Sequence, residues 1–178
     1  MINLNFVFSE IFISISIMFL LILGVFKNKS SNLIYNLSIL SLFIILISNY
    51  NLFGKDELTI FNNSYKIDFL SSFMKFLVIA SGIFVMLSSS KYLKLNKIYK
   101  IEYPILILSS ILGMMIMISA NDLIVFYMGL ELQSLALYVL ATFNRDQIKS
   151  SEAGLKYFVL SALSSGLLLY GCSLIYGF

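Results

Sequence analysis

Charged residues are scarce in this chain. They make up 12% of its 178 residues, while 60% of the residues are hydrophobic. A soluble domain usually has about 25% charged and 45–50% apolar residues. So little charge cannot cover a globule in water, which excludes a soluble enzyme, a disordered chain and a nucleic-acid-binding protein. The composition predicts a protein that crosses a membrane several times.

Histidine is absent, and Cys172 is the single cysteine. One cysteine excludes a disulfide framework and a cysteine-based metal or iron–sulfur site within the chain. The lack of histidine removes the commonest transition-metal ligand and the usual proton shuttle at neutral pH. We therefore expect this chain to bind no metal and no redox cofactor.

Six apolar stretches have the roughly 20 residues that a membrane-spanning helix needs. They cover residues 6–26, 33–53, 69–87, 103–120, 123–143 and 153–178. No linker is long enough to separate domains, so we expect one all-α transmembrane domain over 1–178. In the connection 54–68, apolar residues alternate around Asn62-Asn63, which predicts a short surface hairpin.

The basic residues are distributed unequally between the connections. Lys55 and Lys66 lie in the connections after the second span, on one side of the membrane. Eight others follow the first, third and fifth spans: Lys27, Lys29, Lys91, Lys94, Lys97, Lys100, Arg145 and Lys149. Positive charge favours the cytoplasmic or matrix side, so both termini are expected on the opposite side.

Glu131 lies near the middle of the fifth span. A charge there costs about 2.5–3.5 kcal/mol on insertion scales, so this acid must face protein or water, or be protonated. Tyr127, Glu131, Ser134 and Tyr138 recur at helical intervals and share one face. A polar face with a central acid predicts a proton path in which the hydroxyl groups orient water.

Lys156, early in the sixth span, is the expected cationic partner of Glu131, because a buried lysine can shift its pKa. Glu152 lies four residues before Lys156, a spacing that allows the two to pair on their own helix. Two alternatives remain open. Glu131 could be a structural acid at a helix interface, and Lys156 could extend to the membrane surface with Glu152 as its partner.

Several other polar residues have simpler interpretations. Lys75, inside the third span, is expected to extend to the membrane surface. Asp68, Glu102 and Asp122 lie at helix starts and suit N-capping. Ser161, Ala162, Ser165 and Gly166 have the spacing of small residues that pack helices together.

The second half of the chain carries a recognisable pattern. Its parts are Glu102-Tyr103-Pro104, Asn121-Asp122-Leu123, the run GLELQSLALYVL from Gly129 to Leu140, and SSEAGLKYFVLSALSSG from Ser150 to Gly166. Over 102–178 this pattern resembles subunit 2 of proton-pumping NADH:ubiquinone oxidoreductase, respiratory complex I, an antiporter-like membrane subunit. Related subunits of cation/proton antiporters share the fold. Over 1–101 the resemblance is topological.

The resemblance implies roles for individual residues. Glu131 matches a glutamate needed for proton translocation, and Lys156 matches a lysine of the next helix, with Glu152 one turn before it. It also implies that NADH, FMN, iron–sulfur clusters and ubiquinone are bound elsewhere in the complex. The family has about fourteen helices in two inverted repeats, so the lysine on its seventh helix has no counterpart here. We expect a second chain to supply the remaining helices of a split subunit; the alternative is that the sequence is a fragment.

The expected function is therefore part of a proton channel in the complex I membrane arm, among other membrane subunits and lipids. The excess of Ile, Asn, Lys, Phe and Tyr, with no visible presequence, suggests an organelle-encoded subunit of the mitochondrial inner membrane. The alternative is a bacterial plasma membrane. Two other functions remain open: a stand-alone proton-coupled antiporter and a structural membrane subunit without proton transfer.

Overall fold

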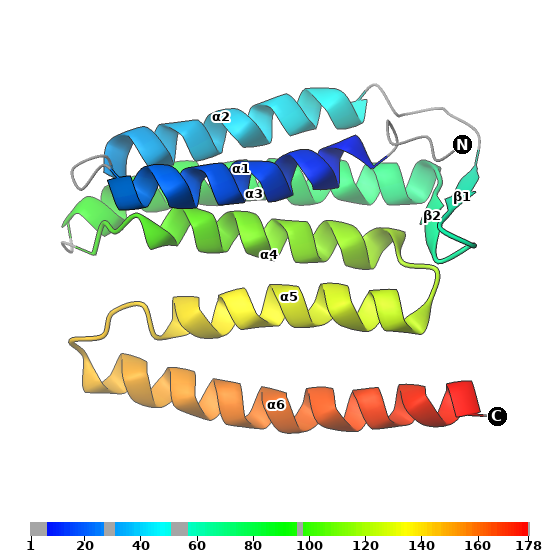
Figure 1. Cartoon of the computed structure of the whole chain (residues 1–178). Coiled ribbons are helices and arrows are strands. Elements are labelled where there is room, and N and C mark those ends of the chain that lie inside the picture. The colour runs from blue at the N-terminus through cyan, green and yellow to red at the C-terminus, as the bar shows by residue number, and fades with distance from the viewer. Residues whose placement is uncertain (1–6, 27–30, 51–56, 96–97, 178) are drawn as a thin grey trace.

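The computed structural model describes residues 7–26, 31–50, 57–95 and 98–177. Within these residues six helices lie side by side, and each runs in the opposite direction to the one before it (Figure 1). They are α1 (Phe8–Phe26), α2 (Ser31–Tyr50), α3 (Phe69–Leu95), α4 (Glu102–Ser119), α5 (Leu123–Ala141) and α6 (Ile148–Gly177). All six are long and apolar enough to cross a membrane, which confirms the predicted all-α membrane fold.

The first four helices form a bundle with its own apolar core. Within it α1 packs against α2 and α4, and α3 packs against α2 and α4. Fully buried side chains at the centre include Leu42, Ile79, Leu108 and Met115. α5 packs on α4, and α6 packs on α5, so the last two helices extend the bundle in a row (Figure 1).

The helices differ from the predicted spans mainly at their ends. α3 continues eight residues beyond Leu87 to Leu95, and α6 begins at Ile148, five residues before Ala153. Both extensions are polar, which a hydropathy pattern does not mark because a helix can continue into water after it leaves the lipid. Residue 6, residues 51–53 and residue 178 of the predicted spans lie outside the described residues.

A short hairpin follows α2, as the alternation around Asn62-Asn63 predicts. Strands β1 (Leu58–Ile60) and β2 (Tyr65–Ile67) pair antiparallel, with Leu58 opposite Ile67 and Ile60 opposite Tyr65. Three consecutive turn residues have positive φ: Phe61 at 56°, Asn62 at 53° and Asn63 at 68°. Asparagine tolerates this conformation, whereas for phenylalanine it is a strained backbone.

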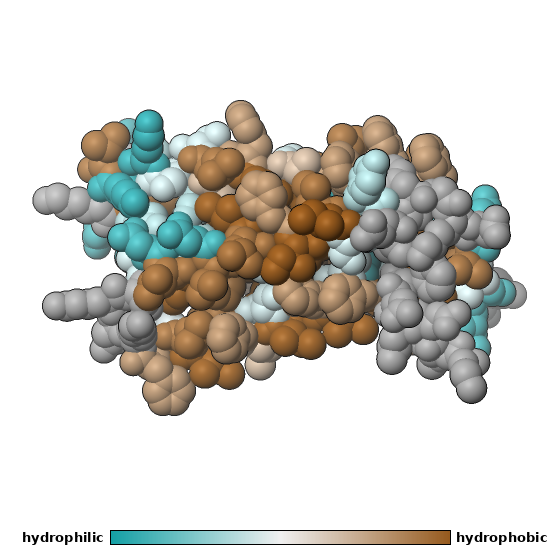
Figure 2. All heavy atoms as spheres, turned by 90° about the horizontal axis from the view of Figure 1, so that it is seen from above, coloured by the Kyte–Doolittle hydropathy of each residue, from teal (hydrophilic) through white to brown (hydrophobic). Residues whose placement is uncertain are grey.

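The two ends of the helix bundle differ in character. We call the end with β1, β2 and the α4–α5 turn the hairpin end, and the other the basic end (Figure 1). Among the described basic residues, Lys91, Lys94, Lys100, Arg145 and Lys149 belong to the basic end. Figure 2 shows hydrophobic side chains across the middle of one face and hydrophilic ones toward its ends.

Two of the three predicted helix caps are present. The backbone N–H of Ser71 donates to Asp68 Oδ1 at 2.7 Å, and that of Ile124 donates to Asp122 Oδ1 at 3.2 Å. The prediction for Glu102 was wrong. Ile101 holds the capping position of α4 without a side-chain hydrogen bond, and Glu102 is the first helical residue. A carboxylate there still interacts favourably with the helix dipole.

Candidate functional site

The position of α5 depends on two glycines that bring its backbone against α4. A Cβ atom added at Gly129 would lie 2.8 Å from the backbone nitrogen of Met117 and 2.9 Å from the carbonyl oxygen of Gly113. A Cβ added at Gly113 would lie 2.7 Å from the carbonyl oxygen of Gly129. Only glycine permits so close an approach. The contact at Gly129 fixes the position of α5 at a point two residues before Glu131.

Glu131 is the ninth of the 19 residues of α5, halfway along the helix. Its Oε2 atom is buried and finds no hydrogen-bond partner among the residues that the structure describes. Buried polar atoms are nearly always paired, so a solitary carboxylate oxygen calls for a proton, a water molecule or a partner from outside this chain.

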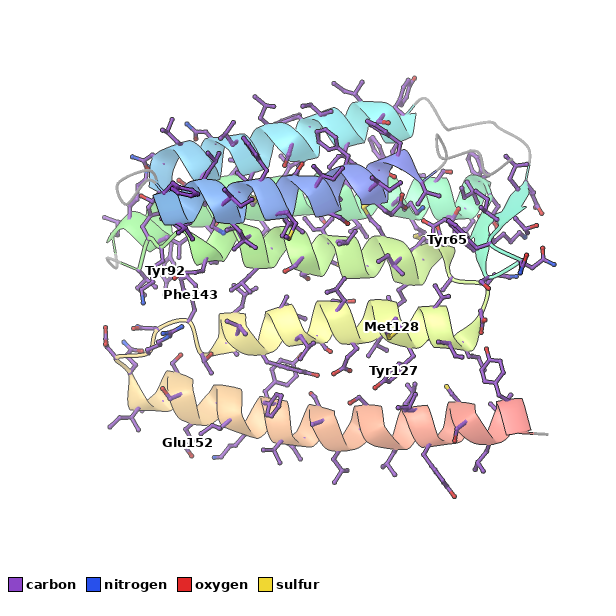
Figure 3. The ribbon with its side chains drawn as sticks, in the orientation of Figure 1. Tyr65, Tyr92, Tyr127, Met128, Phe143 and Glu152 are labelled. Carbon is purple, nitrogen blue, oxygen red and sulfur yellow. The ribbon has the colours of Figure 1, made fainter. Side chains whose placement is uncertain are left out.

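The hydroxyl-bearing residues near Glu131 have different surroundings. The Ser134 hydroxyl donates to the Glu131 carbonyl oxygen at 3.0 Å, one turn back on α5. Tyr138 is buried and packs edge-on against Tyr157 and Phe158 of α6, with ring centroids 4.8 and 5.8 Å apart. Tyr127 is half-buried and lies on the side of α5 that faces α6 (Figure 3).

Lys156 forms its ion pair with Glu152 and not with Glu131. Its Nζ atom lies 2.6 Å from Glu152 Oε1, and the two side chains are 70% and 59% exposed. Glu152 lies on the side of α6 turned away from α5 (Figure 3). The structure therefore realises the local i,i+4 pairing that the spacing allows, and the expected contact between Lys156 and Glu131 is absent from the described part of the chain.

Most of the surface of α6 is open. Gly154 and Cys172 are its only buried residues in the described part of the helix. A Cβ added at Gly166 would meet nothing within 4 Å, so Gly166 makes no close helix contact in the described part of the chain. The other small residues, Ser161, Ala162 and Ser165, are half-buried or exposed. Large apolar side chains such as Leu160, Leu163 and Leu167 are also exposed, and lipid or other helices must cover them.

Sequence reasoning missed a buried charged cluster at the hairpin end. Lys75 Nζ lies 2.6 Å from Glu10 Oε1, and the two residues are 3% and 5% exposed. The prediction that Lys75 extends to the membrane surface was therefore wrong. Its amine pairs with a carboxylate inside the bundle, so neither buried charge is left without a partner.

Tyr65 of β2 completes this cluster. Its hydroxyl donates to Glu10 Oε1 at 2.6 Å and accepts from Lys75 Nζ at 2.9 Å (Figure 3 labels Tyr65). Burial and the adjacent Glu10 carboxylate raise the pKa of the Tyr65 phenol, so the hydroxyl stays protonated and can donate. One signal was available in the sequence: Glu10 is an acid in an otherwise apolar stretch, as Glu131 is.

The part of the chain that contains α5 and α6 is similar to a known family of membrane proteins. Residues 120–178 match the family model described as NADH:quinone oxidoreductase/Mrp antiporter, TM. The chain is 68% identical over 176 residues to NADH-quinone oxidoreductase subunit N of Pelagibacter ubique, covering 99% of the chain and 37% of that relative. It is 50% identical over 175 residues to subunit N of Paramagnetospirillum magneticum, covering 97% of the chain and 35% of the relative.

The fold also resembles that of a solved structure. A chain from the structure of respiratory complex I from Thermus thermophilus with bound aureothin superposes with a TM-score of 0.80 at 26% identity. The match covers 95% of this chain and 36% of the other. This chain spans about a third of the length of the relatives it matches. By sequence the chain therefore matches part of the proteins named NADH-quinone oxidoreductase subunit N, and by fold it matches part of a chain of respiratory complex I, the complex that its motifs resemble.

Proposed function

We propose that this chain forms part of a proton-translocation channel in the membrane arm of an NADH-quinone oxidoreductase, with Glu131 as the group that takes up and releases the proton. The observation that carries this proposal is the buried, unpartnered Oε2 atom of Glu131 halfway along α5. α5 lies within residues 120–178, the region that matches the family model. A carboxylate is one of the side chains that can accept a proton and donate it again.

Lys156 is the second proposed proton-transfer residue, with Glu152 as its resting partner. The exposed ion pair between them contributes little stability, so Lys156 can exchange partners at small cost. Its alternative partner would come from helices that pack on the open face of α6. The path is then supported by the hydroxyl groups of Tyr127, Ser134 and Tyr138. Contacts already fix two of these residues, because Ser134 bonds to the Glu131 carbonyl oxygen and Tyr138 packs against Tyr157.

We further propose that the remaining two thirds of the subunit cover α5 and α6. The relatives are about three times as long as this chain, and α6 leaves most of its apolar surface exposed. Whether those helices belong to a second chain or continue this one, they would carry the remaining charged residues of the path. NADH, FMN, the iron–sulfur clusters and ubiquinone would be bound by other subunits.

The relatives also bear on location. Both subunit N proteins named above are bacterial, which favours a bacterial plasma membrane over the mitochondrial inner membrane. In either membrane the basic end faces the cytoplasm or matrix, and the hairpin end faces the opposite side.

The decisive experiment replaces Glu131 with Gln in the intact oxidoreductase. We expect normal assembly on blue-native electrophoresis and a several-fold loss of NADH-driven proton pumping in proteoliposomes, because glutamine keeps the shape and removes the proton site. Glu131→Asp should retain part of the activity. Asp146→Asn, a change to an exposed acid of the α5–α6 connection, is the matched control. Parental pumping in Glu131→Gln would leave only a structural role for this acid.

A stand-alone proton-coupled antiporter is the second candidate, because the matching family model also covers Mrp antiporters. The two functions differ in the size of the native assembly. Migration with a large NADH-oxidising complex supports the oxidoreductase, whereas cation-driven proton exchange by a small assembly without NADH oxidation supports the antiporter.

A further inference from the structure

The charged cluster at the hairpin end joins three elements that are far apart in the sequence. Glu10 comes from the first turn of α1, Lys75 from the second turn of α3, and Tyr65 from β2. All three are at most 6% exposed. The second carboxylate oxygen of Glu10 accepts a hydrogen bond from the Ser9 hydroxyl at 2.7 Å, so the carboxylate is bonded through both oxygens.

Such a cluster is a poor way to gain stability. Removing two charges from water costs about as much as their attraction returns, and apolar residues of similar size often serve as well. What a buried ion pair provides is a single arrangement, because a shift of α1 or α3 would leave a charge unpaired. A shift of β2 would break the hydrogen bonds of Tyr65 to both charged groups. The best-attested use of such groups is to fix the register of the elements that carry them.

The hairpin, whose position the charged cluster fixes through Tyr65, also contacts the α4–α5 turn. Tyr65 forms a β-bridge with Ala120, and the Asn121 backbone N–H donates to the Ser64 carbonyl oxygen at 3.0 Å. The Asn121 side chain donates to the Asn63 carbonyl oxygen at 2.6 Å. The next residue, Asp122, caps α5. A continuous set of hydrogen bonds therefore runs from Glu10 and Lys75 through the hairpin to the first turn of α5.

The backbone of the hairpin turn supports this connection. Phe61, Asn62 and Asn63 all lie in the left-handed region, which asparagine tolerates but which Phe61 keeps only where surrounding contacts hold it. This turn presents the carbonyl oxygens of Asn63 and Ser64 to Asn121. Without such contacts the turn would relax, and Phe61 would leave its strained φ of 56°.

We infer that Glu10, Lys75 and Tyr65 form a latch, the hairpin latch, which holds the α4–α5 turn against the four-helix bundle and thereby sets the position of Glu131. Glu131 lies nine residues after Asp122, about 13.5 Å along the helix. Because α5 is one continuous helix, a displacement of its first turn also displaces Glu131. Gly113 and Gly129 set the separation of α4 and α5, while the latch sets where α5 starts. The three latch residues are positioning residues, and the inference rests on the proposed role of Glu131.

A disulfide across the docked hairpin tests this inference in the assembled oxidoreductase. Ser64 and Asn121 flank the antiparallel Tyr65–Ala120 bridge and are joined by one backbone hydrogen bond. Residues opposed in this way have Cα atoms about 5.5 Å apart. A disulfide can span that distance. Ser64→Cys and Asn121→Cys are introduced with Cys172→Ser, which removes the single native cysteine. This parent is then combined with Tyr65→Phe, or with the neutral pair Glu10→Gln and Lys75→Met, which leaves no unpaired buried charge.

Two measurements follow: the rate of disulfide formation and proton pumping in proteoliposomes. We expect the parent to cross-link readily and, once cross-linked, to pump like the protein that carries Cys172→Ser alone. Tyr65→Phe and the neutral pair should cross-link about tenfold more slowly, the effect of losing one or two hydrogen bonds, and should pump several-fold less. Oxidation should then restore their pumping to within about twofold of the parent, since the disulfide replaces the latch.

Three results would overturn the inference. Parental cross-linking and pumping in both latch variants would show that the cluster holds nothing in place. A pumping loss that the disulfide does not restore would assign the cluster to proton transfer itself. Loss of pumping in the cross-linked parent would show that the hairpin must move during turnover. Because cross-linking is measured without turnover, the latch can be confirmed even if Glu131→Gln pumps normally and the proposed function fails.

Discussion

Gly113 of α4 and Gly129 of α5 bring their two helices into backbone contact. A Cβ at Gly113 would lie 2.6 Å from the backbone nitrogen of Gln133, and a Cβ at Gly129 would lie 2.8 Å from that of Met117. Neither backbone atom can move aside without moving its helix. Since Glu131 lies between Gly129 and Gln133 on α5, this contact determines how far the acid lies from the four-helix bundle.

Gly129→Ala should therefore displace α5. Overpacking of a close contact typically costs about 1–3 kcal/mol, and we expect a lower thermal midpoint of the purified protein and reduced pumping. Gly82→Ala is the graded control, because the Cβ there would meet the Ile111 side chain, which can rotate away. Equal losses in the two variants would mean that the α4–α5 contact has no special importance.

Glu10 and Lys75 should show strong coupling in a double-mutant cycle. Removing one partner of a buried ion pair leaves an uncompensated charge and commonly costs about 3–5 kcal/mol. We expect Glu10→Gln or Lys75→Met alone to reduce the yield of folded protein sharply. The double change should recover most of that yield. Additive losses, with the double variant the least stable, would contradict a direct pairing of the two side chains.

The six helices were predictable because the membrane imposes their length and composition. Each span must satisfy its backbone internally over about 30 Å of hydrocarbon, so hydrophobic runs mark it directly. The two aspartate caps were predictable for a similar reason, since their hydrogen bonds to Ser71 and Ile124 are local. The polar ends of α3 and α6 were not, because a helix outside the lipid has no hydropathy signature.

The candidate site was predictable only where it depends on local spacing. The i,i+4 spacing predicted the Lys156–Glu152 pair as an alternative, and the position of Glu131 halfway along an apolar helix predicted an acid with a buried carboxylate oxygen. The pairing of Lys75 with Glu10 joins residues 65 positions apart. No periodicity within one helix reports such a contact. Tyr138 shares a face with Glu131, as predicted, yet it packs against aromatic rings of α6, a contact that also depends on tertiary structure.

Asp68 should make stability depend on pH in the acidic range. The backbone N–H of Ser71 that donates to Asp68, together with its hydroxyl and with Lys66, holds the pKa of this carboxyl below its ordinary value of 3.8, against the opposing effect of burial. The ionised form is therefore favoured in the folded state. Its contribution is complete above about pH 4 and is lost as the pH falls through the lowered folded pKa.

The measurement for Asp68 is the thermal midpoint of the purified protein from pH 6 to pH 3. At pH 6 the free energy of unfolding of the parent should exceed that of Asp68→Asn by about 0.3–1 kcal/mol, the effect of a charge at a helix N-terminus. The thermal midpoint of the parent should be higher accordingly. The difference should shrink on acidification. Asp146→Asn, at an exposed acid without an ion pair in the described chain, should show no such pH-dependent difference. A difference for Asp68→Asn that stays constant to pH 3 would exclude its charge as the cause.

Lys156→Met should separate stability from proton transfer, because its ion pair is exposed. An exposed i,i+4 pair contributes about 0.3–0.5 kcal/mol, so neither Lys156→Met nor Glu152→Gln should change assembly or the thermal midpoint noticeably. If Lys156 relays charge, Lys156→Met should still lower NADH-driven pumping several-fold, and Lys156→Arg should not restore it, since arginine does not release its proton. Lys149→Met, at an exposed lysine near the start of the same helix, is the matched control and should pump like the parent. Parental pumping in Lys156→Met would reduce this lysine to a surface partner of Glu152 and leave Glu131 as the one proton-transfer residue proposed for this chain.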